Sequence, residues 1–220
     1  MLNIKGMKTT LFVLFTCMTI SVFAQGRKLE MAHYIFPEFV RGSVVLHKGG
    51  HTAAMLNYNA LTEEMIFDKQ GKKLAMTNLS EIDTVVIEGR IFIPYQKKFI
   101  ELIYTSKYEL FVAHKCSLID PGKPAAYGGT SQTSSTTAFS NFYSGGQIYE
   151  LALPDGYTTK PYKEYFLKKD GTVTSFLTVK QLSKAFDSQS DVFKSYTKSH
   201  KVDYDNQESL VELVKFMEQQ

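Results

Sequence analysis

The sequence contains no tryptophan and only two cysteines, and it lacks an apolar run long enough to cross a membrane comfortably. Cys17 lies in an N-terminal segment that we expect to be removed, so Cys116 remains alone and no intramolecular disulfide can form. The apolar residues 11–23 are fewer than the roughly 20 that a membrane-spanning helix needs. The fold must therefore be held by its apolar core, to which many of the 13 Tyr and 16 Phe contribute.

The chain also lacks an excess of charge of one sign. It contains 25 Lys and Arg against 22 Asp and Glu, and two of the lysines, Lys5 and Lys8, lie in the N-terminal segment. Without that segment the counts are 23 and 22, which leaves a net charge of +1. Positive and negative charges are therefore nearly equal in number. The sequence shows no excess of positive charge of the kind that binds nucleic acid or attaches strongly to an anionic membrane surface.

The N-terminal residues have the pattern of a secretory signal peptide. Lys5 and Lys8 provide a positive region, the apolar residues 11–23 follow, and small residues stand at the −3 and −1 positions before Gln25. We therefore expect residues 1–24 to be a signal peptide that is cleaved before Gln25.

A lipoprotein anchor at Cys17 is the rival interpretation of the same segment. Much of the apolar run lies after this cysteine, which favours ordinary cleavage instead. On the first interpretation the mature protein is exported, either to the periplasm or to the cell surface, and has no transmembrane span.

The middle of the chain predicts antiparallel strands. Residues 82–116 are dense in Val, Ile, Phe and Tyr and are broken only by short polar turns, as expected of half-buried strands. Further hairpins are predicted at residues 41–59, where two glycines mark the bend, at 64–76, and at 162–177. Asp170-Gly171 in the last of these is a strong hairpin signal.

Because hairpin follows hairpin, we expect a curved antiparallel sheet or partial β-barrel, and a two-sheet sandwich is the alternative. The fold class is thus α+β, with a β domain at residues 25–178 and docked helices at residues 179–220. Acidic residues near turns, Glu63 among them, are expected to be solvated or turn-forming.

After Thr178 the apolar period changes from two to 3.6, which predicts three short C-terminal helices. The first is expected at residues 179–186 and the second at 191–200, with Ser190 as its N-cap. The third is expected to begin near Asp205, whose carboxylate would act as the cap. Its apolar residues have the spacing of one helix face: Leu210, Leu213, Val214 and Met217.

Residues 117–146 form a long Gly, Ser and Thr-rich segment without helical or strand periodicity. Loops of this length are usually functional or disordered, and aromatic residues are uncommon in disordered segments. The segment carries four candidate binding residues: Tyr127, Phe139, Phe142 and Tyr143. They could present rigid aromatic contacts to a partner, or they could fold back and cover one open side of the sheet.

Four side chains would meet the ligand count of a zinc site: His47, His51, His114 and Cys116. The first two bracket a glycine bend, and the last two share one strand face by period two. Spacing alone does not bring the two groups together. The alternative is that the turn histidines are solvated and that the cysteine acts as a small buried hydrophobe.

Sequence motifs for catalysis are missing. There is no Gly-x-Ser-x-Gly elbow, no His-Glu-x-x-His and no calcium-binding Asp-rich loop. Ser195 and Lys198 fit a Ser-x-x-Lys pattern without its companion motifs, and an exposed helix face explains the pair better. A thiol hydrolase that uses Cys116 and His114 would lack an evident third group to orient the imidazole.

Several stretches together resemble a known group of proteins. They are the sequence NYN beginning at Asn57, DTVVIEGRIFIP at residues 83–94, AAYGGTSQTSS at 125–135, and YTKSHKVDYDNQESLVELVKFM at 196–217. The chain resembles exported envelope proteins of unassigned function from Bacteroidetes-type bacteria. The resemblance supports export and implies no activity, substrate or catalytic residue.

The sequence therefore favours a non-enzymatic exported envelope protein that acts as a binding or protein-interaction module. Its expected partner is an envelope protein or a surface glycan, and no cofactor or nucleic acid is expected. The alternative is a metal-dependent or thiol hydrolase of the periplasm that uses the histidine and cysteine side chains named above.

Overall fold

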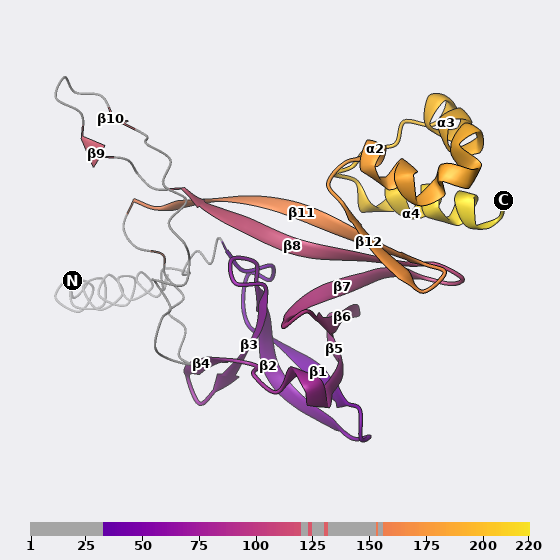
Figure 1. The fold of residues 1–220 in the computed structure, drawn as a ribbon. Helices are drawn as coiled ribbons and strands as arrows, with labels where there is room; N and C mark the ends of the chain where they lie inside the picture. Colours follow the sequence, from indigo (N-terminus) through magenta and orange to yellow (C-terminus); the bar gives the residue numbers. More distant parts are fainter. Residues whose placement is uncertain (1–32, 120–122, 125–129, 132–152, 154–155) are drawn as a thin grey trace, which may run out of the picture. The chain divides into compact units, whose positions relative to one another are not determined.

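Ten strands of the described part of the chain form one antiparallel sheet, which the computed structural model shows for residues 33–119, 123–124, 130–131, 153 and 156–220 (Figure 1). All of these residues belong to one compact unit, Met31–Gln220. Within them, no helix combines the length and the apolar character that crossing a membrane requires.

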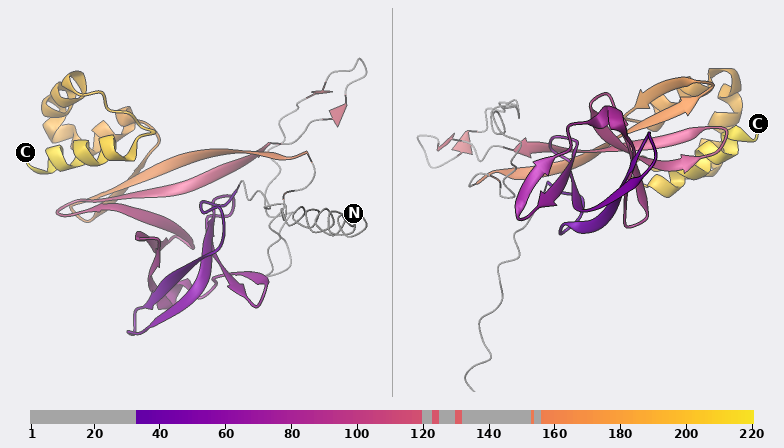
Figure 2. Two further views of the ribbon diagram at one scale, coloured as in Figure 1. Left: turned by 180° about the vertical axis from the view of Figure 1, so that it is seen from behind. Right: turned by 90° about the horizontal axis from the view of Figure 1, so that it is seen from below.

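The hydrogen-bonded order of the sheet is β12-β11-β8-β7-β6-β5-β1-β2-β3-β4, so that β12 and β4 are its edges. The strands are β1 (Val40–Leu46), β2 (His51–Asn59), β3 (Glu64–Lys69), β4 (Lys72–Ala75), β5 (Ile82–Ile87), β6 (Arg90–Tyr95), β7 (Lys98–Thr105), β8 (Glu109–Ile119), β11 (Thr158–Lys169) and β12 (Thr172–Phe176). Two short strands, β9 (Lys123–Pro124) and β10 (Thr130–Ser131), pair separately. Figure 2 shows the long neighbours β8 and β11 side by side in two further views.

The predicted hairpins are confirmed as β1–β2, β3–β4 and β11–β12, but the expected hairpin-after-hairpin order is wrong at one step. β5 pairs with β1 and not with the preceding strand β4. Gly42 permits this pairing, because a Cβ atom there would lie 2.6 Å from the carbonyl oxygen of Val86 on β5. The ten main strands form a single sheet and not the alternative two-sheet sandwich.

The C-terminal segment contains two regular α-helices, α3 (Ser190–Ser199) and α4 (Gln207–Glu218), where three helices were predicted. Residues 179–189 instead form one α-helical turn, α2 (Val179–Leu182), and a 3₁₀ segment, η3 (Ser183–Gln189). Phe186 has non-helical backbone angles (φ −123°, ψ 32°), and its ring is fully buried against the sheet. The backbone leaves the helical conformation at this residue because burying the ring stabilises the fold more than continuing the helix would.

Both predicted N-caps are displaced by one residue. The side chain of Asn206, not that of Asp205, accepts from the backbone N–H of Ser209 at 3.0 Å and caps α4. Ser190 is the first residue of α3, and Gln189 stands at its N-cap position without a side-chain hydrogen bond. Aspartate and asparagine are nearly equal as N-caps, so the sequence did not distinguish the two neighbours at the start of α4.

The helices cover one face of β7, β8, β11 and β12, and they bury an apolar cluster there. The predicted face of α4 is confirmed, because its four apolar residues Leu210, Leu213, Val214 and Met217 are fully buried. At the other end of α4, the Glu218 carboxylate accepts from the backbone N–H groups of Lys107 and Tyr108 and from the Tyr104 hydroxyl. These contacts tie the end of the helix to the β7–β8 turn.

A second apolar cluster is enclosed by the curve of the sheet between β1, β2, β5, β6 and β7. Its largest fully buried members include Leu56, Tyr58, Phe92 and Phe99, and the rings of Tyr58 and Phe92 stack at 5.5 Å. Three strands separate β2 from β7 in the hydrogen-bonded order, yet the Tyr58 hydroxyl on β2 donates to the carbonyl of Phe99 on β7 at 3.0 Å. The sheet must therefore curve strongly across β1, β5 and β6.

Truncating the buried face of α4 tests how firmly the helices are held. Leu213→Ala is expected to lower the free energy of unfolding by about 3 kcal/mol, because it removes packed methyl groups and leaves a cavity. Glu212→Ala, at the exposed neighbouring position, should change it by less than about 0.5 kcal/mol. Urea unfolding followed by circular dichroism measures both, and equal values would contradict a tightly docked helix.

Candidate functional site

The four aromatic residues predicted to bind a partner, Tyr127, Phe139, Phe142 and Tyr143, lie outside the described residues. The segment that contains them leaves β8 at Ile119 and returns at the start of β11. Their role as binding residues stays a prediction.

His47 and His51 lie at the β1–β2 hairpin, but they are not opposite each other in the register. His51 begins β2 and pairs with Val45, whereas His47 lies in the turn. The Nδ1 atom of His47 is 3.3 Å from a carboxylate oxygen of Asp83, and both side chains are more than half exposed. This surface pair fits the alternative that the turn histidines are solvated.

His114 and Cys116 share one face of β8, as the period of two predicts, but their side chains have different neighbours. The Nε2 atom of His114 lies 2.5 Å from Glu101, whereas the Cys116 thiol faces the carbonyl oxygen of Ser117 at 3.8 Å. Burial raises the pKa of the Cys116 thiol, which keeps it protonated and weakly nucleophilic at neutral pH. Among the described residues, no three His, Cys, Asp or Glu side chains form a group that could hold a metal ion.

A partly buried charged cluster, in which only Glu101 is fully buried, joins three adjacent strands where sequence reasoning expected none. The Nε and Nη2 atoms of Arg90 on β6 both donate to the carboxylate of Glu101 on β7 at 2.7 Å. The Nη2 atom also lies 3.0 Å from Nε2 of His114 on β8. The guanidinium stands over the rings of Phe36 and Phe92, at 5.1 and 5.4 Å from their centroids.

The electrostatics of this cluster fix its protonation state. Burial alone would raise the pKa of Glu101, but hydrogen bonds from Arg90 and His114 outweigh it and lower the pKa to about 2. Burial lowers the pKa of His114, and the nearby Glu101 only partly opposes the change. At neutral pH the cluster therefore holds an ionised carboxylate and a neutral imidazole, each already engaged with its neighbours. Its role is to tie β6, β7 and β8 together.

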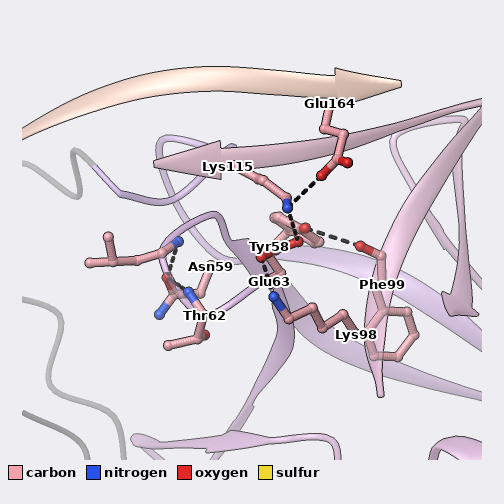
Figure 3. A network of polar contacts seen from close by, with 9 residues as sticks. Tyr58, Asn59, Thr62, Glu63, Lys98, Phe99, Lys115 and Glu164 are labelled. Carbon is pink, nitrogen blue, oxygen red and sulfur yellow. Dashed lines mark hydrogen bonds and ion pairs between the residues drawn. The ribbon is translucent and has the colours of Figure 1, made fainter. Parts of the chain in front are cut away.

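A second network, named the clasp here, connects the β2–β3 turn to β7, β8 and β11 (Figure 3). It consists of Glu63, Lys98, Lys115 and Glu164. The Glu63 carboxylate pairs with Lys98, and its other oxygen lies 3.6 Å from Nζ of Lys115. Lys115 also donates to Glu164 across the β8–β11 pair at 2.6 Å. Glu63 is buried, which corrects the expectation that it is a solvated turn residue.

The backbone around Glu63 is shaped for this contact. Glu63 adopts a left-handed conformation with φ of 59°, which is uncommon outside glycine, and its carbonyl accepts from the N–H of Phe99 at 3.0 Å. The preceding turn is held by the side chain of Asn59, which accepts from the N–H groups of Leu61 and Thr62 at 2.9 and 3.4 Å (Figure 3). Sequence reasoning missed the clasp because its members lie on four separate segments.

A cavity of about 410 Å³, named the clasp cavity here, opens beside this network. Its polar lining comprises the four clasp residues together with Gln96 and Ser175. Its apolar lining comprises Tyr95, Ile100, Phe166 and Val173. The rings of Tyr95 and Phe166 meet edge to face, with their centroids 5.3 Å apart.

An open apolar pocket of about 350 Å³, named the edge pocket here, lies beside the edge strand β4. Strands β1 to β4 and the segment before β5 form it, and its apolar lining includes Val44, Leu46, Ala54, Phe67, Leu74, Met76 and Ile82. Its polar lining residues Thr52, Thr77, Asn78 and Glu81 are all exposed. The pocket thus has an apolar floor and a polar mouth, and it shares no lining residue with the clasp cavity.

Comparisons with known proteins add no further constraint on the site. No family model, no curated protein and no solved structure matches the chain. The function must therefore be argued from the geometry of the described residues.

Removing the central charge of the clasp should destabilise the fold. Glu63→Gln leaves Lys115 half-paired in a largely buried position, and we expect a loss of about 2 kcal/mol in the free energy of unfolding. Glu109→Gln breaks the more exposed pair with Lys168 on β11 and should cost less than about 1 kcal/mol. Urea titration at one pH compares the two variants, and an equal loss would show that the clasp adds nothing beyond a surface pair.

The Arg90 cluster predicts an acid-sensitive fold. The pKa of Glu101 is about 2 in the folded protein and 4.5 in its unperturbed form, so its contribution to stability is present above pH 4.5 and is lost as pH falls toward 2. The loss amounts to about 3 kcal/mol over that window. Unfolding free energies of the wild type and of Glu101→Gln, measured between pH 5 and pH 2.5, should show a flatter dependence in the variant. Parallel curves would contradict the assignment.

Proposed function

We propose that this protein is an exported, non-enzymatic interaction module of the cell envelope that binds an extended segment of a partner protein. The segment adds to the sheet as a new strand beside β4 and places one apolar side chain in the edge pocket. The observation that carries the proposal is the position of an open apolar pocket directly beside β4, which is an edge of the sheet formed by the described residues.

The backbone of β4 has the right alternation for strand addition. The N–H of Met76 donates to the carbonyl of Met65 on β3 at 2.9 Å, and antiparallel ladders alternate bonded and non-bonded pairs. Leu74 is then also in a bonded pair, whereas the N–H and C=O groups of Lys73 and Ala75 point away from β3. An added strand would meet these outward groups, and such main-chain bonds supply affinity in strand addition.

The edge pocket supplies selectivity for the same partner. Its volume lies within the range of small ligand sites, at the lower end, and so it suits a single apolar side chain. Leu74 on β4 and Met76 directly after it point to the same face by period two, and both line the pocket. Alternate side chains of an added strand would point to this same face, so one of them can enter the pocket.

The residues considered for hydrolysis support this non-enzymatic proposal. The Nε2–H group of His114 donates to Glu101, and the Cys116 thiol has a raised pKa. Export is proposed on the sequence alone, from the leader-like residues 1–24. The envelope location of the partner follows from that export.

Binding of a designed peptide tests the proposal. The probe is a fluorescent peptide of alternating threonine and charged residues with one central leucine. In the control peptide, glycine replaces this leucine. Thr52→Phe fills the mouth of the pocket, whereas His51→Phe puts the same ring on the opposite face of β2. We expect the first variant to weaken binding of the leucine peptide by about tenfold and the second by less than about twofold.

The edge itself is tested by a second pair of variants. Lys73→Pro removes an outward N–H, and Lys73→Ala keeps that N–H while removing the side chain that pairs with Asp68. Only the proline variant should lose the peptide in fluorescence anisotropy, while both retain the wild-type circular dichroism spectrum. The proposal fails if the leucine and glycine peptides bind alike, or if no saturable binding is seen at millimolar concentration.

A further inference from the structure

The clasp cavity has a chemical character quite different from that of the edge pocket. One part of its wall is apolar and partly aromatic, with the edge-to-face rings of Tyr95 and Phe166. Another part carries an unbroken series of charged groups, from Lys98 through Glu63 and Lys115 to Glu164. Hydroxyl and amide groups of Ser175 and Gln96 complete the lining.

The charges in this lining cancel, and that restricts the ligand. Two lysines and two glutamates line the cavity, and each of the four side chains is already in an ion pair. A charged ligand would have to displace one of these pairs, and the Glu63 and Lys115 side chains are mostly shielded from water, which makes the exchange costly. A neutral ligand whose groups both donate and accept can add hydrogen bonds to lysine and carboxylate without breaking a pair.

We propose that the clasp cavity binds a neutral saccharide unit. Sugar hydroxyls are donor and acceptor at once, so one hydroxyl can bridge Lys115 and Glu164, while the apolar face of the sugar ring packs on Tyr95. The volume of about 410 Å³ is within the range of small-ligand sites. The inference is independent of the proposed peptide binding, because the two sites share no lining residue.

The arrangement of the carboxylates indicates binding and not cleavage. Glycoside hydrolysis needs one carboxyl group that delivers a proton to the leaving oxygen and a second that acts on the opposite side of the bond. In the clasp, Glu63 and Glu164 are bridged by the ammonium group of Lys115, at 3.6 and 2.6 Å. Both carboxylates already accept from lysine, and the Lys115 ammonium group occupies the place between them.

Saturation-transfer NMR and calorimetry on the intact protein test the inference. The probes are methyl glycosides of glucose, galactose, mannose and N-acetylglucosamine and the corresponding disaccharides, with glucuronate and glucosamine as charged comparators. We expect saturable binding of at least one neutral probe and none of the charged pair. Ser175→Phe, which blocks the cavity from the exposed face of β12, and Glu164→Gln should each weaken this binding by about tenfold.

Matched controls separate the cavity from the fold and from the peptide site. Glu109→Gln breaks a similar β8–β11 ion pair outside the cavity and should leave saccharide binding within about twofold of the wild type. Thr52→Phe in the edge pocket should also leave it unchanged. The inference is overturned if no neutral probe binds, if the charged probes bind in preference, or if Glu164→Gln and Glu109→Gln have equal effects.

Discussion

The fold depends on the contact that the Glu63 turn makes with the start of β7. In the hydrogen-bonded order these segments are far apart, and only the strong curvature of the intervening strands brings them together. The carbonyl of Glu63 accepts from the Phe99 N–H, its carboxylate pairs with two lysines, and the Tyr58 hydroxyl adds a bond to the same part of β7. A left-handed backbone at a non-glycine residue costs free energy, and these contacts offset that cost.

This constraint also bears on the two cavities, which lie in differently supported parts of the sheet. The clasp fixes the β2–β3 turn against β7 and β8, and the clasp cavity opens where the charged side chains converge. Among the described residues, β4 is the last strand of the sheet and hydrogen-bonds to β3 alone, and no clasp residue lies on it. The edge pocket has its wall in this part of the sheet.

The sequence was sufficient to locate most strands, because apolar residues recur with a period of two and Asp-Gly or Gly-Gly marks the bends. It could not assign partners to those strands, because the sequence pattern does not say whether β5 pairs with β1 or with β4. One requirement of the observed pairing is the lack of a side chain at Gly42, which leaves room for the carbonyl group of Val86 on β5. The short helix predicted at residues 179–186 failed for a similar reason, because the burial of Phe186 against the sheet is a long-range effect.

The candidate sites could not be predicted from the sequence for the same reason, because they depend on which strands pair. Arg90, Glu101 and His114 are separated along the chain and meet only through the register of three strands. A weak local signal existed in Glu101, a charged residue at an inward position between the apolar Phe99 and Ile103. Glu63 gave no such signal, because acidic residues in turns are ordinarily exposed.

One face of β8 belongs to both apolar clusters at once. Leu110 and Val112 pack under the helices, Cys116 packs inside the curve of the sheet, and His114 stands between them. A shift in this single strand therefore disturbs both halves together, so neither half can loosen without strain in the other. We therefore expect the two apolar clusters to unfold as one cooperative unit, with β8 as the element that they share.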